Sequence, residues 1–226
     1  GKELADGEKA TVHIPWSEFA DHIMSIMRTD VRLRRVTIAR IFFLIAGMAS
    51  PLYVLYARQV VGLPEESLGI FVGAQAVGSA VGTFVLGRVA DRFGTRRLIQ
   101  VGTVIVITAP FVALVSVLAG LSSGPLATAL FAWIYIAVGL SGSLVFLGFL
   151  NYALDISGET GQRTIYLGAT NAIGTIGVVG PTIGGLILQV SDYPVLFLTA
   201  ALCGLLALAL VMLLPDSLIP ASEVMT

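Results

Sequence analysis

Apolar residues dominate the chain in six long runs that are separated by short polar links. The runs cover residues 36–61, 68–86, 98–120, 125–154, 165–190 and 194–214. An α-helix needs roughly 20 apolar residues to cross the hydrocarbon core of a bilayer, and each run is near that length. The links carry turn-forming residues, such as Gly62 and Pro64 after the first run. The pattern predicts an all-α membrane protein with six transmembrane helices.

The first 35 residues follow a different pattern, in which apolar residues form one helical stripe opposite polar residues. The stripe consists of Trp16, Phe19, Ala20, Ile23 and Met27. A helix with this pattern rests at a membrane surface. We expect it to pack on its own membrane domain, and a partner-binding or regulatory helix is the alternative. The chain is therefore divided into a cytoplasmic linker with an amphipathic helix (1–35), a six-helix transmembrane unit (36–216) and a cytoplasmic tail (217–226).

Composition excludes an ordinary soluble domain. The mean hydropathy is +0.92, and charged residues make up 12% of the chain, against roughly 25% in a typical globular protein. The net charge of −1 provides no field that would attract nucleic acid, so we predict no nucleic-acid partner. Cys203 is the only cysteine, which excludes an internal disulfide and a multi-cysteine metal site. We predict no metal, no cofactor and no enzymatic activity. The chain begins without a methionine or a signal peptide, so we expect it to be part of a longer protein.

The basic residues indicate the orientation of the six helices. If the helices alternate in direction, all but one of the arginines near the runs fall on the same side, and Arg58 is the exception. The arginines on the common side are Arg28, Arg32, Arg34, Arg35, Arg40, Arg88, Arg92, Arg96, Arg97 and Arg163. Short loops rich in arginine and lysine stay in the cytoplasm. Both termini are therefore expected to be cytoplasmic, in a protein of the bacterial plasma (inner) membrane.

The link between the second and third runs carries the most specific motif. Residues 87–97 read GRVADRFGTRR. The spacing resembles the G-x-x-x-D-R-x-G-x-R-R loop of the major facilitator superfamily of transporters. The matching residues are Gly87, Asp91, Arg92, Gly94, Arg96 and Arg97. The resemblance implies a loop that biases a switch between two conformations, and topology control by positive charge is the simpler alternative.

Elementary chemistry gives these residues distinct roles. Gly94 can adopt the positive φ that a tight turn needs, and Gly87 allows a neighbouring helix to approach. Asp91 can interact with a helix N-terminus or with an arginine. Arginines can bind carboxylates or lipid phosphates through two parallel hydrogen bonds, and such contacts can form in one conformation and break in another. Thr95 lies outside the motif, and we expect it to contribute little.

Small residues mark two runs as closely packed. Membrane helices associate through close backbone approach, which favours glycine, alanine and serine. The second run contains Gly69, Gly73, Gly78 and Gly82. The fifth run contains a segment that resembles the G-P-x-x-G-G motif of the same superfamily, although its upstream spacing departs by one residue. The residues of this helix-packing motif are Gly177, Gly180, Pro181, Gly184 and Gly185. They predict tight packing and a proline bend, from which we infer no exchange mechanism.

Polar and aromatic residues within the runs are candidates for a substrate path, because polar side chains at mid-depth face the bundle interior or water. They are Tyr53, Tyr56, Gln75, Trp133, Ser141, Asn151 and Asn171. The resemblance implies that the first and fourth helices line the path. For any single residue, a contact between helices or an interfacial position is the simpler interpretation. Arg40 and Arg58 lie near helix ends and are expected to extend toward water.

The resemblance implies a fold and a function together. Superfamily carriers have two six-helix halves around a central site, and each half consists of two inverted three-helix repeats. We expect this chain to be the C-terminal half, because its fourth run lacks the basic residue common in the first half. The expected function is secondary active transport of a small solute by alternating access, with an N-terminal six-helix half of the same polypeptide and the lipid bilayer as partners. The candidate path residues are aromatic and amide side chains without a charge at mid-depth, so a neutral, amphipathic or hydrophobic solute is expected.

Two other classes compete with transport. A six-helix membrane scaffold or sensor without transport activity is the main alternative, and a test of substrate-dependent flux separates the two. An intramembrane protease is the other, because residues 139–142 match a G-x-S-G sequence around Ser141. A serine nucleophile needs a base to accept its proton. The only histidines, His13 and His22, precede the first run, which argues against the protease.

Overall fold

The structure of the chain is a computed structural model that describes residue 25 and residues 28–157, 163–174 and 176–215. The described residues are helical throughout, with short connections and no strand. The elements are α2 (Val31–Ala46), the 3-10 turn η1 (Gly47–Ala49), α3 (Leu52–Gln59), α4 (Glu66–Leu118), α5 (Pro125–Ile156), α6 (Arg163–Gly174), α7 (Ile176–Val190) and α8 (Tyr193–Met212). The predicted stripe in the linker and the tail at 217–226 fall outside the described residues.

Six helical segments of the described chain are long and apolar enough to cross a membrane. They confirm the predicted all-α membrane class, with some differences at their ends. The first segment begins at Val31, five residues earlier than expected, because the Asp30 carboxylate caps the helix and accepts hydrogen bonds from the backbone N–H groups of Arg32 and Leu33 at 2.7 and 3.3 Å. The arginines that follow are consequently part of the helix rather than of a preceding loop.

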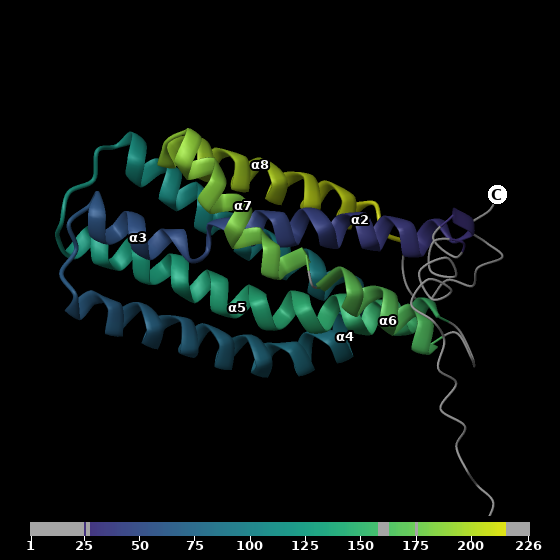
Figure 1. Cartoon of the computed structure of the whole chain (residues 1–226). Coiled ribbons are helices and arrows are strands. Elements are labelled where there is room, and N and C mark those ends of the chain that lie inside the picture. The colour runs from purple at the N-terminus through teal and green to yellow at the C-terminus, as the bar shows by residue number, and fades with distance from the viewer. Residues whose placement is uncertain (1–24, 26–27, 158–162, 175, 216–226) are drawn as a thin grey trace, which may run out of the picture.

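The first membrane segment is broken in the middle. The helix α2 ends at Ala46, η1 covers the next turn, and α3 starts after Pro51. Proline has no N–H and its ring clashes with the preceding turn, so a helix cannot continue through it undisturbed. The segment therefore consists of two shorter helices, α2 and α3, which follow one another along the length of the bundle (Figure 1).

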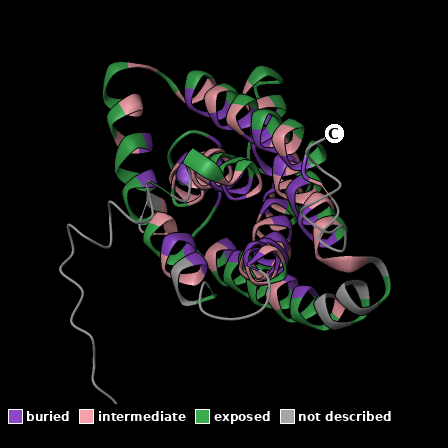
Figure 2. Cartoon of the chain, turned by 90° about the vertical axis from the view of Figure 1, so that its right-hand side faces the viewer, coloured by how far each residue is buried: buried purple, intermediate pink, exposed green. Residues whose placement is uncertain are grey.

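The helices pack lengthwise into one bundle. α8 lies beside α2, and α4 lies along α5 (Figure 1). Viewed end-on, the buried faces of the helices turn toward one another and the exposed faces turn outward (Figure 2). The interior contains two apolar clusters. One is rich in aromatic rings and includes Tyr53, Phe131 and Phe197, and the other includes Ile99 and Phe149.

Glycines bring α4 and α5 close together, as their spacing predicted. A Cβ atom on Gly82 would lie 2.7 Å from the carbonyl oxygen of Leu140, and one on Gly78 would overlap the backbone of Ile136. A Cβ atom on Gly69 or Gly73 would meet nothing within 4 Å. Only the second G-x-x-x-G pair of this helix therefore makes a close contact within the described bundle.

Candidate functional site

The link between the second and third membrane segments is a bend within α4. Its backbone stays helical except at Gly94, where φ is 78° and ψ is 163°. A side chain is strained at this positive φ, which accounts for glycine at this position of the motif. The Arg92 side chain is exposed. The motif positions Gly87 and Asp91 lie outside the residues whose side chains the structure describes, so their roles stay predictions.

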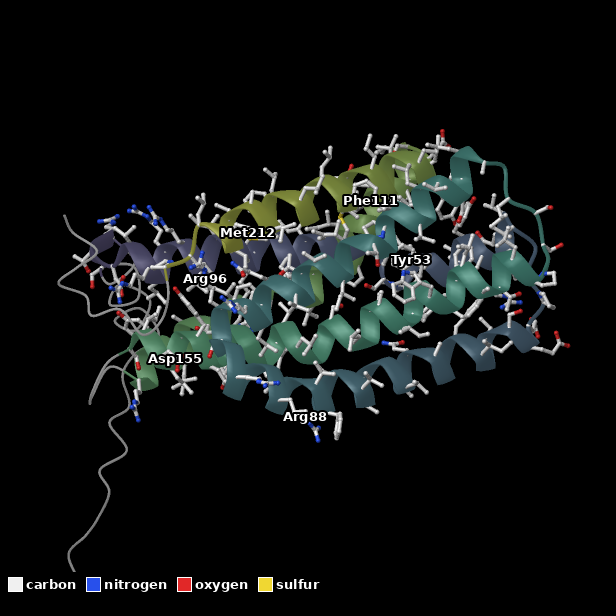
Figure 3. All side chains as sticks on the ribbon, turned by 180° about the vertical axis from the view of Figure 1, so that it is seen from behind. Tyr53, Arg88, Arg96, Phe111, Asp155 and Met212 are labelled. Atoms are coloured by element: carbon white, nitrogen blue, oxygen red, sulfur yellow. The ribbon has the colours of Figure 1, made fainter. Side chains whose placement is uncertain are left out.

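Residues directly after the bend connect α4 to two other helices. The hydroxyl of Thr95 donates a hydrogen bond of 2.8 Å to the Asp155 carboxylate, near the end of α5. The Arg96 guanidinium donates one of 2.9 Å to the carbonyl oxygen of Met212, the last residue of α8. In Figure 3, the labelled Arg96, Met212 and Asp155 lie toward the same end of the bundle. Thr95 was expected to contribute little, and its hydrogen bond to Asp155 gives it a contact between helices that the sequence did not indicate.

Two tyrosines join further helices at the same end. The Tyr166 hydroxyl of α6 donates a hydrogen bond of 2.6 Å to Asp30, the residue that caps α2. The Tyr152 hydroxyl of α5 donates one of 2.8 Å to the carbonyl oxygen of Pro215, just after α8. Polar contacts thus link α2, α4, α5, α6 and α8 at one end of the bundle. We call these four contacts the end network.

A groove of about 480 Å³ lies between α4 and α5. Its lining consists of Gln75, Ser79, Val138, Gly139, Gly142, Ser143, Phe146 and Leu147. The hydroxyl of Ser79 donates to the carbonyl oxygen of Gly139 at 3.3 Å, and that of Ser143 donates to the carbonyl oxygen of Ser79 at the same distance. The exposed Gln75 amide makes no hydrogen bond to a described residue. Its donors and acceptors are available to a molecule in the groove.

The other predicted path residues lie elsewhere. Tyr53 and Tyr56 are each 2% exposed and pack against Phe197, with ring centroids 5.4 Å apart in both pairs. Trp133 donates a hydrogen bond of 3.3 Å to the Thr108 hydroxyl. Tyr53 and its neighbours form an aromatic core within this bundle (Figure 3).

The three remaining candidates are also apart from one another. Ser141 is buried and donates to the carbonyl oxygen of Val138 at 3.2 Å. Asn151 is half-buried on α5, and Asn171 is exposed on α6. Of the seven candidates, the groove therefore contains Gln75 alone. The assignment of all seven to a substrate path stays a prediction.

Sequence reasoning missed the two groove serines. Ser79 lies one helical turn after Gln75, and residues four apart share a helix face. That spacing could have predicted that Ser79 lies on the same helix face as Gln75. Ser143 carries no comparable signal, because its place beside Ser79 depends on how α5 packs against α4.

The helix-packing motif of the fifth segment contacts the break in the first segment. A Cβ atom on Gly184 would lie 2.8 Å from the carbonyl oxygen of Met48, and one on Gly180 would lie 3.4 Å from that of Leu44. A Cβ on Gly177 would meet the Leu44 side chain at 3.0 Å. Pro181 is exposed, and a Cβ on Gly185 would meet nothing within 4 Å. Three of the five motif residues therefore face α2 and η1.

The two arginines that were expected to extend toward water differ in the structure. The Arg58 side chain is 43% exposed and forms an ion pair with Glu65. Arg40 is only 4% exposed, and its guanidinium carbon lies 5.8 and 5.9 Å from the ring centroids of Phe146 and Phe149. The expectation was wrong for Arg40, because α5 and α6 cover the helix face that carries it.

The described residues bring no three histidine, cysteine, aspartate or glutamate side chains together in a group that could hold a metal. A protein-family model described as the Major Facilitator Superfamily matches residues 37–223. A search of curated proteins finds no match to the chain.

Proposed function

Because this chain belongs to the major facilitator superfamily, a family of membrane transporters, we propose that it is one half of a secondary carrier that moves a small solute by alternating access. The other half is an N-terminal bundle of six helices in the same polypeptide. The six membrane-length helices are consistent with half of the superfamily fold. The chain is an integral membrane protein. The proposal adds that it acts by alternating access and that it pairs with a second six-helix half.

The groove between α4 and α5 carries this proposal. It lies on the surface of the bundle, and the polar side chains Gln75, Ser79 and Ser143 line it among apolar residues. Polar groups at membrane depth are unfavourable in contact with lipid and are found beside other protein or a water-filled path. A second bundle placed over the groove would turn it into a path between two halves, as in carriers with a central site.

Exposed apolar side chains are present on α4, which forms the groove, and on α7. On α4 they include Val72, Val77 and Val81, and on α7 they include Val178 and Val179. These faces suit close contact with another apolar helix bundle. We infer that the isolated chain does not transport, because half of the wall of the path is absent.

The end network supplies contacts that can differ between two states of the carrier. The bonds of Thr95 and Arg96 join side chains on α4 to the ends of α5 and α8, and both are exposed. A set of exposed bonds at one end stabilises the conformation in which that end is closed and is lost when it opens. Such differential contacts bias a two-state equilibrium.

The arginines support an orientation in which this end faces the cytoplasm of a bacterial cell. Arg32, Arg34 and Arg35 are in the first two turns of α2, and Arg163 is the first residue of α6. The opposite end of the first segment carries Arg58, which is paired with Glu65. The excess of basic residues at one end is the pattern of a cytoplasmic face.

Labelling of a cysteine in the groove tests the mechanism without knowledge of the solute. In the complete carrier, Cys203→Ser removes the natural cysteine of this chain, and Gln75→Cys introduces a new one in the groove. Under alternating access, a membrane-impermeant thiol reagent reacts with this cysteine when applied from either side of the membrane. In a scaffold or sensor with one fixed conformation, it reacts from one side at most. Leu205→Cys, on the exposed apolar face of α8, is the matched control and should stay unlabelled.

A further inference from the structure

Arg40 is a buried charge without a partner among the described residues. It lies ten residues into α2, about 14 Å along the helix from its first residue. The residue is 4% exposed, and its Nη1 atom has no hydrogen-bond partner. The rings of Phe146 and Phe149 flank the guanidinium. Aromatic faces attract a cation but leave most of its N–H donors without a strong acceptor.

No described carboxylate is placed to neutralise this charge. The acidic residues whose side chains the structure describes all lie at or beside helix ends: Asp30, Glu65, Glu66, Asp155 and Asp192. Asp30 already accepts from Tyr166, and Asp155 from Thr95. A charged group buried in a membrane protein is costly unless it is paired, and it marks a binding or transport role. The acceptor for Arg40 therefore comes from outside the described residues.

Two hydroxyl groups lie around the same narrow gap as Arg40, which is too tight for a water molecule in this conformation. Thr37 on α2 and Thr170 on α6 line it, together with Val36, Phe149 and Ile173. Thr37 and Thr170 are 4% and 5% exposed, and neither side chain makes a hydrogen bond to a described residue. A guanidinium and two hydroxyls are hydrogen-bond donors suited to the oxygens of a carboxylate or phosphate. The combination is that of an oxyanion-binding site.

One aromatic ring separates Arg40 from the groove. Phe146 lines the groove, is 55% exposed and faces the guanidinium with its ring. On the other side of the arginine, Gly174 leaves room for its head, because a Cβ there would lie 3.2 Å from Nη2. Displacement of the Phe146 ring would open the gap around Arg40 to the groove and make the room that a bound anion needs.

We propose that Arg40, with Thr37 and Thr170, binds the carboxylate or phosphate group of an anionic solute that enters through the groove past Phe146. The inference rests on the proposed transport function and names the substrate class. It replaces the expectation of a neutral solute, which depended on Arg40 extending toward water.

Thermal unfolding of the complete, purified carrier tests the proposal. The probes are phosphate, succinate, benzoate and octanoate, with succinamide, benzamide and octanamide as uncharged counterparts of the three carboxylates. At least one anion should raise the unfolding midpoint of the wild type saturably, and its amide should not. Arg40→Gln should weaken the apparent affinity for that anion by about 30-fold or more. Arg40→Lys should retain part of it, since the charge remains without the planar fork.

Two further variants complete the design. Thr170→Val should weaken anion binding by about 10-fold or more, as expected for one hydrogen bond to a charged group. Arg58→Gln removes an exposed arginine from the same membrane segment. Its unfolding midpoint should rise with anion concentration as that of the wild type does. The proposal is overturned if no anion stabilises the wild type, if the amides stabilise it equally, or if Arg40→Gln titrates unchanged. Arg40→Gln could instead shift the unfolding midpoint measured without solute, while anions have no effect on either protein. That result would show that Arg40 pairs with a fixed carboxylate of another helix, and it would also overturn the proposal.

The labelling test separates this inference from the proposed function. If Gln75→Cys reacts from both sides while no anion binds, alternating access stands and the anion site is wrong. If it reacts from one side only, the transport mechanism itself fails.

Discussion

The Thr95 hydroxyl donates a 2.8 Å hydrogen bond to the Asp155 carboxylate across 60 residues of sequence. The two residues join the start of the third membrane segment to the end of the fourth. Gly94, with its positive φ, turns the chain so that Thr95 faces α5. A residue outside the recognised motif thus makes a contact between helices, beside the one that the motif residue Arg96 makes with Met212.

Thr95→Val should weaken closure of this end of the carrier. Valine keeps the shape but loses the donor, and an exposed hydrogen bond to a carboxylate contributes about 0.5–1 kcal/mol. The ratio of the two conformations should shift about two- to fivefold. The measurement is the ratio of labelling rates of Gln75→Cys from the two sides. Thr83→Val is the control, because the Thr83 hydroxyl donates to the carbonyl oxygen of Ser79 within its own helix. An unchanged ratio would contradict a switching role for the contact.

Asp91→Asn in the complete carrier should impair transport far more than it lowers the amount of inserted protein. The substitution keeps size and hydrogen-bonding ability but removes the charge. A loss of ~1–2 kcal/mol on one side of a two-state equilibrium shifts the ratio of states about 5- to 30-fold. Initial transport rates normalised to inserted protein provide the measurement, and Thr83→Ala is the control, because the Thr83 hydroxyl bonds within its own helix. Normal transport at normal abundance would reduce the motif to a topology signal.

Gly184→Ala should destabilise the bundle, whereas Gly185→Ala should not. A methyl group at position 184 would lie 2.8 Å from the carbonyl oxygen of Met48 and 3.0 Å from the Leu52 side chain, and at position 185 it would meet nothing within 4 Å. Overpacking of this kind costs about 1–3 kcal/mol. Thermal unfolding of the two variants in the same detergent measures the difference. Equal midpoints would show that α7 does not approach η1 this closely.

The orientation can be tested with cysteines in the connections. On the Cys203→Ser background, Glu159→Cys should react with an impermeant reagent only from the cytoplasmic side, and Ser123→Cys only from outside. The reason is that short arginine-rich connections remain in the cytoplasm. Labelling of Glu159→Cys from outside would invert the assignment and place the end network on the other face.

The sequence alone determined the membrane class, the number of helices and the place of the bend at Gly94. These features are local: an apolar run of sufficient length must be a helix in lipid, since its backbone groups have no other partners there. The number of arginines in a short link and the spacing of a motif are likewise read from neighbouring residues. The motif indicated the superfamily whose model matches residues 37–223.

Tertiary structure alone decided which polar side chains meet. Ser143 reaches Ser79 because Gly78 and Gly82 let α4 and α5 approach closely, and no spacing within one helix reveals that pairing. Arg40 was read as a residue at a helix end, yet α5 and α6 cover it. Burial of a side chain depends on which helices cover its face, and that depends on packing over the whole bundle rather than on the position of the residue in its own helix.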